Sequence, residues 1–179
     1  LNSGLAAYTI HRKIYRERAY TGIDGSFSLN DNLHADTLFL VDESSMISNG
    51  MGEGQTFGSG CLLDDLMQFV YSGRNCRIMF IGDNAQLPPV GESESPAMSK
   101  QMIEGYGMTV YQAHLDEVVR QGADSGILYN ATAIRLMATR NEATMMPRIR
   151  LKGFADVEVV RGDELIETLA SSYSHAGVD

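Results

Sequence analysis

Two apolar runs in the sequence each end abruptly at a carboxylate, and this arrangement limits the fold more than any other feature. The first is "FLVDESSMIS", residues 39–48, and the second is "RIMFIGDNAQLPPVG", residues 77–91. Short, continuous apolar runs bounded by polar turns are typical of strands buried in a parallel sheet. We therefore predict two strands whose carboxyl ends carry Asp42, Glu43 and Asp83 at one edge of a sheet.

Strand and helix periods alternate along the chain, and this alternation predicts an α/β fold. Four apolar stretches have the length and composition of strands: residues 37–41, 77–81, 108–115 and 156–160. Four others place apolar side chains on one helical face: residues 6–14, 62–70, 127–138 and 165–173. Strands that alternate with helices form a parallel sheet with helices on both faces. We therefore expect a three-layer α/β domain over residues 1–179, with Ser125 as the N-terminal cap of the third helix.

The formal net charge of −9 argues against a protein that binds nucleic acid over its whole surface. A local basic patch is still compatible with this charge, because residues 11–18, "HRKIYRER", hold four of the 14 Lys and Arg residues. No apolar run approaches the roughly 20 residues that span a bilayer, so we expect no membrane contact. Cys61 and Cys76 fit neither a disulfide framework nor a metal-ligand spacing, which favours free thiols and a cytoplasmic protein.

The acids at the predicted strand ends suit nucleotide hydrolysis, because ligands of open parallel sheets bind beyond the carboxyl ends of the strands. Asp42 can hold Mg²⁺, since a hard cation prefers carboxylate oxygen. Glu43 beside it can orient and deprotonate an attacking water molecule. After the second strand, Gly82 allows the backbone to approach a ligand closely, and Gln86 can hydrogen-bond a phosphate oxygen or water. Taken alone, the acid pair is equally consistent with an ordinary acidic loop.

Four segments together resemble motifs of superfamily 1 DNA helicases, in particular the RecD-like branch that includes the alpha subunit of exodeoxyribonuclease V. "LVDESSMIS" resembles motif II, the Walker B region, and "IGDNAQLPPVG" resembles motif III. "LDEVVRQ", residues 115–121, is similar to motif IV, and "YTIHRKIY", residues 8–15, is similar to the Thr-Ile-His segment of this branch. The four matches occur in family order and cover residues 8–121.

The resemblance implies an ATP-dependent DNA helicase and assigns roles to its nucleotide site. Asp42 would bind the Mg²⁺ of Mg-ATP, and Glu43 would activate water. Gln86 would couple the γ-phosphate to the DNA path. Arg120 would stabilise the charge on the transferring phosphoryl group, as an arginine finger does.

The resemblance also implies partners. Thr9 and His11 would contact single-stranded DNA, chiefly its phosphates. Other helicase-nuclease subunits are the protein partners expected for this branch, which takes part in DNA repair.

The sequence departs from the family pattern in one respect. The family has a phosphate-binding loop, Gly-x-x-x-x-Gly-Lys-Ser/Thr, ahead of these motifs, but none of the three lysines, Lys13, Lys100 and Lys152, follows a glycine. The resemblance therefore implies an incomplete RecA-like P-loop NTPase core: part of a first motor domain, without its Walker A loop and without the second motor domain. We expect the isolated chain to be inactive as an ATPase.

The missing loop also bears on association. In the family the strand before that loop pairs beside the motif III strand, so residues 77–81 are expected at an open sheet edge. Such an edge invites pairing with another chain, which predicts self-association.

Two other functions stay open from the sequence. One is a two-metal phosphoesterase that uses Asp42 and Asp83, although that chemistry usually employs several histidines. The histidines are at positions 11, 34, 114 and 175, and none lies in an evident ligand motif. The other is a non-catalytic nucleotide- or DNA-binding module, which the absent phosphate loop favours.

Overall fold

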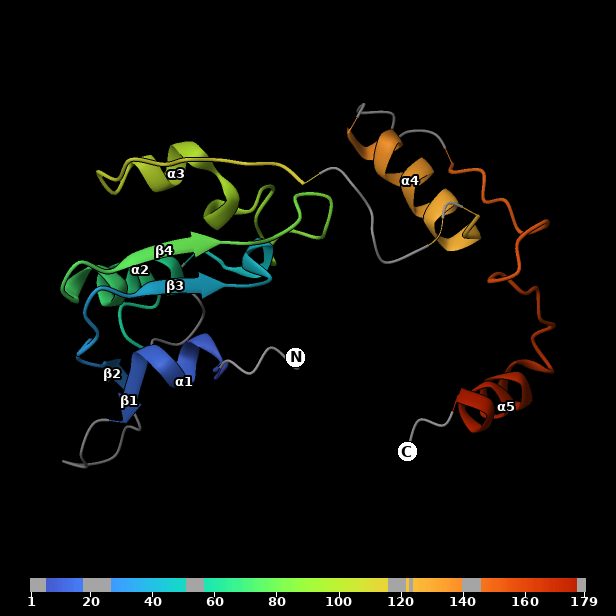
Figure 1. The fold of residues 1–179 in the computed structure, drawn as a ribbon, viewed down its shortest axis with the longest axis horizontal. Coiled ribbons are helices and arrows are strands. Elements are labelled where there is room, and N and C mark those ends of the chain that lie inside the picture. Colours follow the sequence, from blue (N-terminus) through green and yellow to red (C-terminus); the bar gives the residue numbers. More distant parts are fainter. Residues whose placement is uncertain are drawn as a thin grey trace. The chain divides into compact units, whose positions relative to one another are not determined.

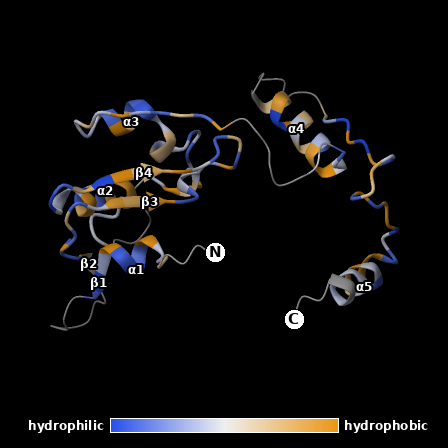
Figure 2. Cartoon of the chain, viewed as in Figure 1, coloured by the Kyte–Doolittle hydropathy of each residue, from blue (hydrophilic) through white to orange (hydrophobic). Residues whose placement is uncertain are grey.

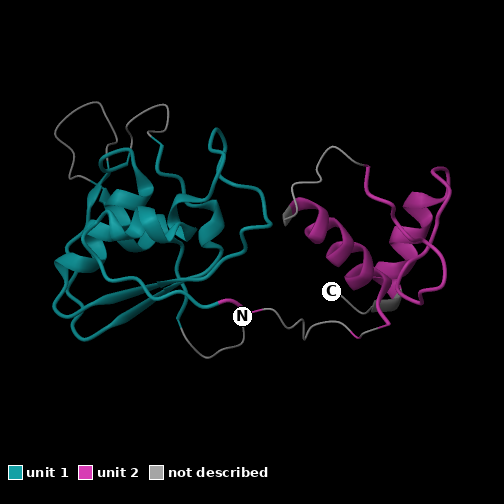
Figure 3. Ribbon diagram, turned by 90° about the horizontal axis from the view of Figure 1, so that it is seen from above, with its two compact units in different colours: residues 1–113 teal, residues 114–179 magenta. Residues whose placement is uncertain are grey.

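The computed structural model describes residues 6–17, 27–50, 57–115, 122, 124–139 and 146–176. The chain divides into two compact units, Leu1–Ala113 and His114–Asp179, shown in different colours in Figure 3. Each unit is described separately below. Among the described residues no helix is both long and apolar enough to cross a membrane.

The elements of the first unit follow one another along the chain as Figure 1 labels them. The strands are β1 (Tyr15–Glu17), β2 (Phe27–Leu29), β3 (Leu38–Val41) and β4 (Arg77–Phe80). The helices are α1 (Ile10–Ile14), α2 (Leu62–Ser72) and α3 (Lys100–Glu104), with two 3₁₀ turns, η1 (Ser44–Met46) and η2 (Pro96–Met98). The second unit contains α4 (Gly126–Thr139) and α5 (Leu165–Ala176). All four predicted helices therefore form, although the first is short.

Strands β3 and β4 pair in parallel, as predicted. Val41 lies opposite Phe80 in the register. The pairing continues beyond both strands, because the Ile81 amide donates to the Val41 carbonyl at 2.8 Å and the Ser44 amide donates to the Ile81 carbonyl at 2.9 Å. The carboxyl ends of both strands thus lie at the same edge, which confirms the arrangement expected for the strand-end acids.

One face of this sheet packs on the hydrophobic core, and both strands are coloured as apolar in Figure 2. Phe39 of β3 meets Phe69 of α2 edge to face, with ring centroids 6.0 Å apart. On the opposite face, four apolar side chains stay 43–57% exposed: Leu38, Leu40, Met79 and Ile81. Within the described residues, the sheet is therefore covered by a helix on one face only.

The described strands form two separate two-stranded sheets, β1–β2 and β3–β4, so the three-layer core that we predict is not confirmed. The strand predicted at residues 108–115 is wrong, because this segment is irregular and pairs with no described strand. Met108 and Val110 still pack against the core at alternate positions, which explains the strand-like pattern. Strand β4 pairs only with β3 among the described strands, and self-association through its other edge stays a prediction.

Helix α2 supplies more buried core residues than any other described element. Leu63, Leu66, Met67 and Val70 lie on one helical face and are each at most 3% exposed. Each such side chain contributes about 1.5–3 kcal/mol when it leaves water. The carboxylates in the first turn of the helix interact favourably with its amino-terminal end.

A buried carboxylate, which the sequence did not indicate, joins α2 to the amino-terminal part of the chain. Asp65 is 2% exposed and accepts hydrogen bonds from the Tyr15 hydroxyl at 2.6 Å and the Ser59 amide at 3.0 Å. Burial, followed by the bond to Asp65, raises the pKa of Tyr15 above its ordinary value. Gly58 has a φ of +49°, and a Cβ there would lie 2.0 Å from Asp65 Oδ2, so only glycine fits this turn.

The amino-terminal end of α4 is capped twice. Ser125 Oγ accepts from the Leu128 amide at 3.0 Å, which confirms the predicted cap. Asp156 accepts from Ser125 Oγ at 2.6 Å and from the amides of Gly126 and Ile127 at 2.8 and 3.2 Å. The strand predicted at 156–160 is therefore wrong: its first residue binds a helix end, and the segment has no strand partner in the described structure.

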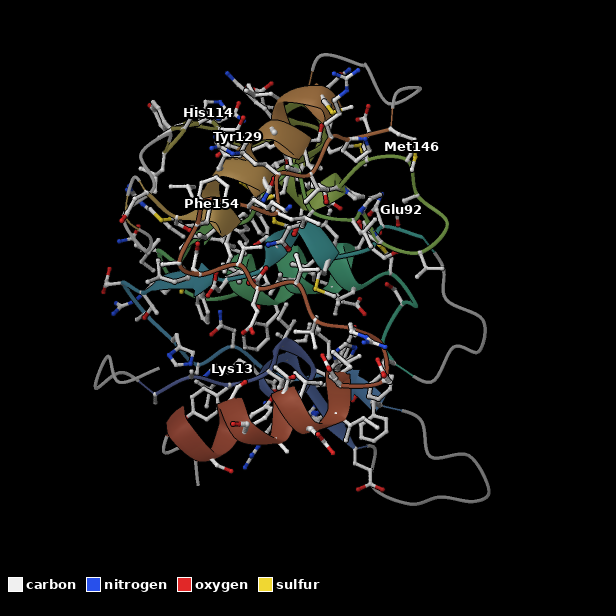
Figure 4. All side chains as sticks on the ribbon, turned by 90° about the vertical axis from the view of Figure 1, so that its right-hand side faces the viewer. Lys13, Glu92, His114, Tyr129, Met146 and Phe154 are labelled. Atoms are coloured by element: carbon white, nitrogen blue, oxygen red, sulfur yellow. The ribbon has the colours of Figure 1, made fainter. Side chains whose placement is uncertain are left out.

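An aromatic contact joins α4 to the segment that follows it. The rings of Tyr129 and Phe154, both labelled in Figure 4, lie 5.6 Å apart. The Arg150 guanidinium lies 5.0 Å from the Phe154 ring centroid, and its backbone bonds to Asn130. The apolar stripe of α5 that begins at Leu165 stays about half exposed or more.

The Tyr15–Asp65 contact predicts a loss of stability on Tyr15→Phe. The change removes one donor from a buried carboxylate, so we expect the free energy of unfolding of the first unit to fall by about 1–3 kcal/mol. Urea denaturation measures this difference. Tyr111→Phe, at a tyrosine that is 92% exposed, is the matched control and should stay within about 0.5 kcal/mol of wild type. Equal unfolding midpoints for the two variants would contradict the role of the contact.

Asp156 predicts an acid-dependent loss of structure at α4. The hydrogen bonds from Ser125, Gly126 and Ile127 lower the pKa of Asp156 from 3.8 to about 2. A lowered pKa means that the contribution to stability is present above the unfolded value and is lost as the pH falls through the folded value. We expect the Asp156 carboxyl resonance in NMR to titrate near pH 2. Wild type should lose helix content at α4 as the pH falls from 4 to 2, whereas Asp156→Asn, which has no carboxyl group at this position, should not show that loss. Titration of Asp156 at the ordinary carboxyl pKa would refute the cap.

Candidate functional site at the carboxyl ends of two parallel strands

The acid pair leaves β3 through a strained bend. Asp42 and Glu43 are both exposed. Glu43 adopts φ 53° and ψ 37°, in the left-handed region, which non-glycine residues rarely occupy. Its amide donates to Asp42 Oδ1 at 3.0 Å. Strain of this kind persists only where the surroundings hold it, and it is common at functional sites.

Two serine hydroxyls, those of Ser44 and Ser95, bond to the backbone on either side of the acids. Ser44 Oγ donates to the Val41 carbonyl at 2.7 Å, and Ser95 Oγ donates to the Ser45 carbonyl. Both Ser44 and Ser45 are fully buried. Ser45 Oγ has no hydrogen-bond partner among the described residues. These two hydrogen bonds thus hold the turn η1, while Asp42 and Glu43 stay exposed.

Gly82 brings the second strand against this turn. A Cβ at Gly82 would lie 2.9 Å from the Ser45 amide nitrogen and 2.8 Å from Met98 Sδ. Contacts with backbone at such distances cannot be relieved by a side-chain movement. The close approach that we expected between Gly82 and a ligand is therefore, in this structure, an approach between two protein segments.

The segment after β4 forms a rigid polar turn. The Asp83 carbonyl accepts from the Gln86 amide at 3.0 Å, and Asp83 Oδ1 accepts from the Ala85 amide at 2.9 Å. Side chains of this kind, which bond to the backbone two residues on, stabilise turns. Pro89 is buried and begins the next turn, whereas Gln86 is exposed.

A polar hollow of about 320 Å³ adjoins Gln86. Its lining is rich in amide and hydroxyl groups: Asn84, Gln86, Pro88, Ser93, Glu94, Ser95, Met98 and Ser99. Ser95, which bonds to the backbone beneath the acid pair, is the link between this hollow and η1. No local sequence pattern indicates this role of Ser95, because its partner Ser45 is distant along the chain.

A second hollow of similar volume lies against α2 and is mainly apolar. Tyr106 and Asp64 form a 2.5 Å hydrogen bond at its wall, and burial raises the pKa of Tyr106. None of the strand-end acids lines it.

The structure brings some of the predicted site residues together. Asp42 and Glu43 follow β3, and the turn that carries Gln86 follows the adjacent β4, at the same sheet edge. Arg120 lies outside the described residues, so the structure does not place it.

Thr9 directly precedes α1 and His11 lies within it, and both are exposed. Thr9 occupies the N-cap position, and its carbonyl accepts from the Lys13 amide at 3.1 Å. The His11 ring lies 5.2 Å from the Phe57 ring and 5.7 Å from the Tyr15 ring. These contacts fix the orientation of the histidine on the surface of the first unit.

Basic and aromatic side chains surround this pair. Lys13 Nζ lies 5.2 Å from the centroid of the Tyr8 ring and 2.8 Å from His34 Nε2. Arg16 forms an exposed ion pair with Asp31 at 3.2 Å. Tyr8 itself is 60% exposed. The segment from Tyr8 to Arg16 thus carries basic side chains together with the exposed rings of Tyr8 and His11, a combination that suits single-stranded nucleic acid.

The donor set at the strand ends fits Mg²⁺ held together with a nucleotide. Mg²⁺ is usually bound by one or two carboxylates, water and substrate phosphates, and Asp42 and Glu43 supply exposed carboxylates. Within the described ranges no group of three or more His, Cys, Asp or Glu residues could hold a metal ion.

Comparison with known proteins gives one match. The family model described as "AAA domain" matches residues 1–150 of the 179. No curated protein and no solved structure matches. The family indicates a RecA-like α/β fold and a function of the nucleotide-binding or ATPase type.

The matched range contains the acid pair, the turn with Gln86 and the helix with Thr9 and His11. Because it covers most of the chain, the protein belongs to the AAA domain family of P-loop NTPases, a family associated with RecD-like helicases.

Proposed function

We propose that the chain is part of an ATP-dependent DNA helicase of the RecD-like type, which couples Mg-ATP hydrolysis to movement along single-stranded DNA. One observation carries the proposal. An exposed Asp-Glu pair and a rigid turn with an exposed glutamine follow two adjacent parallel strands at the same edge of a sheet. The family supports the nucleotide chemistry.

Mg-ATP supplies the phosphoryl group that is transferred, and the chain supplies groups that position it and accept a proton. Asp42 would hold the Mg²⁺ ion through its carboxylate. Glu43 would orient a water molecule and take its proton. Glu43 is exposed, and its left-handed backbone leads directly into η1, where Ser44 and Ser45 are buried.

Gln86 would hydrogen-bond a phosphate oxygen from the neighbouring strand end. Its turn is held by the bonds to Asp83, so little reorganisation is needed when the phosphate arrives. Positioning and charge stabilisation provide nearly all of the catalysis in phosphoryl transfer. Arg120 is proposed to add positive charge, by the resemblance to motif IV.

On the DNA side, Thr9 and His11 would contact the strand, with the cations of α1 attracting its phosphates. Other helicase-nuclease subunits are proposed partners by the same resemblance. No Gly-x-x-x-x-Gly-Lys-Ser/Thr motif occurs in the 179 residues, so we expect these residues on their own to hydrolyse no ATP.

Glu43→Gln tests the role of the acid pair. In the full-length gene product, we expect DNA-stimulated phosphate release to fall by about 100-fold or more, because a general base is lost, while ATP binding persists because the shape is kept. The measurements are phosphate release with and without single-stranded DNA, and binding of a fluorescent ATP analogue. The control Glu104→Gln changes an exposed carboxylate on α3 and should leave both unchanged. Full turnover in Glu43→Gln would remove Glu43 as the base.

Thr9→Ala with His11→Ala tests the DNA contact. We expect the affinity for labelled single-stranded oligonucleotides to fall, and the affinity of wild type to decrease steeply with salt, since phosphate contacts release counterions. Fluorescence anisotropy at several salt concentrations measures both. Thr109→Ala with His114→Ala changes the same residue types at exposed positions and should bind as wild type does. Equal affinities for the two double variants would take α1 out of the DNA path.

A further inference from the structure

A single carboxylate oxygen joins the segment after the acid pair to the segment after the glutamine turn. Glu92 Oε1 accepts hydrogen bonds from Ser48 Oγ at 2.5 Å, the Asn49 amide at 2.9 Å and the Gly50 amide at 3.0 Å. Figure 4 labels Glu92 on the chain that follows β4. We call these four residues the Glu92 junction.

The chemistry of the junction makes it strong for its size. Hydrogen bonds to an ionised carboxylate are shorter and about twice as strong as neutral ones, and the 2.5 Å contact to Ser48 has the length of such a bond. The Gly50 amide also donates to Ser48 Oγ at 2.9 Å, so the donors are held together. Because all three bonds end on one oxygen, a shift of either segment weakens them together.

The Glu92 junction is a second connection between the two segments that carry the candidate site, in addition to the pairing of β3 with β4. On one side the chain runs from Glu43 through η1 to the buried Ile47 and then to Ser48. On the other side it runs from Gln86 to the buried Pro89, whose carbonyl accepts from the Glu92 amide at 3.0 Å. The strand ends join the two sides at the base. The acid pair and the glutamine therefore lie on two loops that are tied at both ends.

We propose that Glu92 is a positioning residue that holds the loop of Asp42 and Glu43 in fixed relation to the turn of Gln86. The inference rests on the proposed function, because it concerns the geometry of that nucleotide site. Glu92 acts through the two loops and touches no reacting group. Its loss would leave nucleotide binding in place but would misalign the group that activates water with the group that contacts the phosphate.

The test compares Glu92→Ala, Glu92→Gln and the control Glu104→Ala in the full-length gene product. Residue-resolved hydrogen–deuterium exchange reports on the amides of Asn49 and Gly50. Steady-state ATPase with single-stranded DNA gives kcat and KM separately. The exchange arm reads the junction itself and needs no catalysis, whereas wild-type ATPase reads the proposed function.

We expect Glu92→Ala to speed exchange at both amides and to lower kcat by about tenfold or more, since small misplacements of catalytic groups are costly, while KM changes little. Glu92→Gln keeps a carbonyl oxygen at the accepting position, so it should restore most of the protection and bring kcat to within about threefold of wild type. Glu104→Ala should match wild type in every reading.

Three results would overturn the positioning role. Unchanged exchange at Asn49 and Gly50 in Glu92→Ala would show that the junction does not hold the loop. Faster exchange with unchanged kcat would show that the junction is structural only. Protected amides in a wild-type protein that hydrolyses no ATP would end the proposed function and this role with it, while leaving the junction as a contact of the fold.

Discussion

The parallel pairing of β3 with β4 is the constraint on which the rest of the site depends. Two paired strands of four residues each would not by themselves determine the positions of the loops that follow them. Their hydrogen bonds, however, continue through Ile81 into η1. This continuation determines where the segment after each strand leaves the sheet. The acid pair and the glutamine turn are neighbours because of main-chain bonds, and their own side chains stay exposed for other partners.

The exposed acid pair is directly followed by a turn with two buried serines. Ser44, Ser45 and Ile47 are buried, whereas the acids between them and the strand are not. Ser95, which follows the glutamine turn in the sequence, bonds to η1, and Gly82 lies so close to η1 that a methyl group would not fit. The carboxylates of Asp42 and Glu43 would thus be attached to a backbone segment that is tightly packed and hydrogen-bonded.

Sequence patterns predicted the parts of this structure that depend on local chemistry. The strands near Val41 and Phe80, the core face of α2 and the Ser125 cap all follow from short-range spacing. The pattern at residues 108–115 failed because alternate burial there arises from packing on the core, without a partner strand. The apolar residues after Asp156 favour a strand, but the carboxylate of Asp156 binds the end of α4. The bonds of Asp65 and Glu92 join distant segments, and no local pattern signals them.

The backbone at Glu43 has a consequence for how this sequence can change. A left-handed conformation costs an ordinary L-residue about 1–2 kcal/mol relative to glycine, so glycine at position 43 would relax the bend and remove the carboxylate in a single step. Selection for heat resistance alone would favour that replacement, and selection for turnover would reject it. The residue found at position 43 in variants enriched under each regime would therefore reveal which of the two pressures acts on the bend after β3.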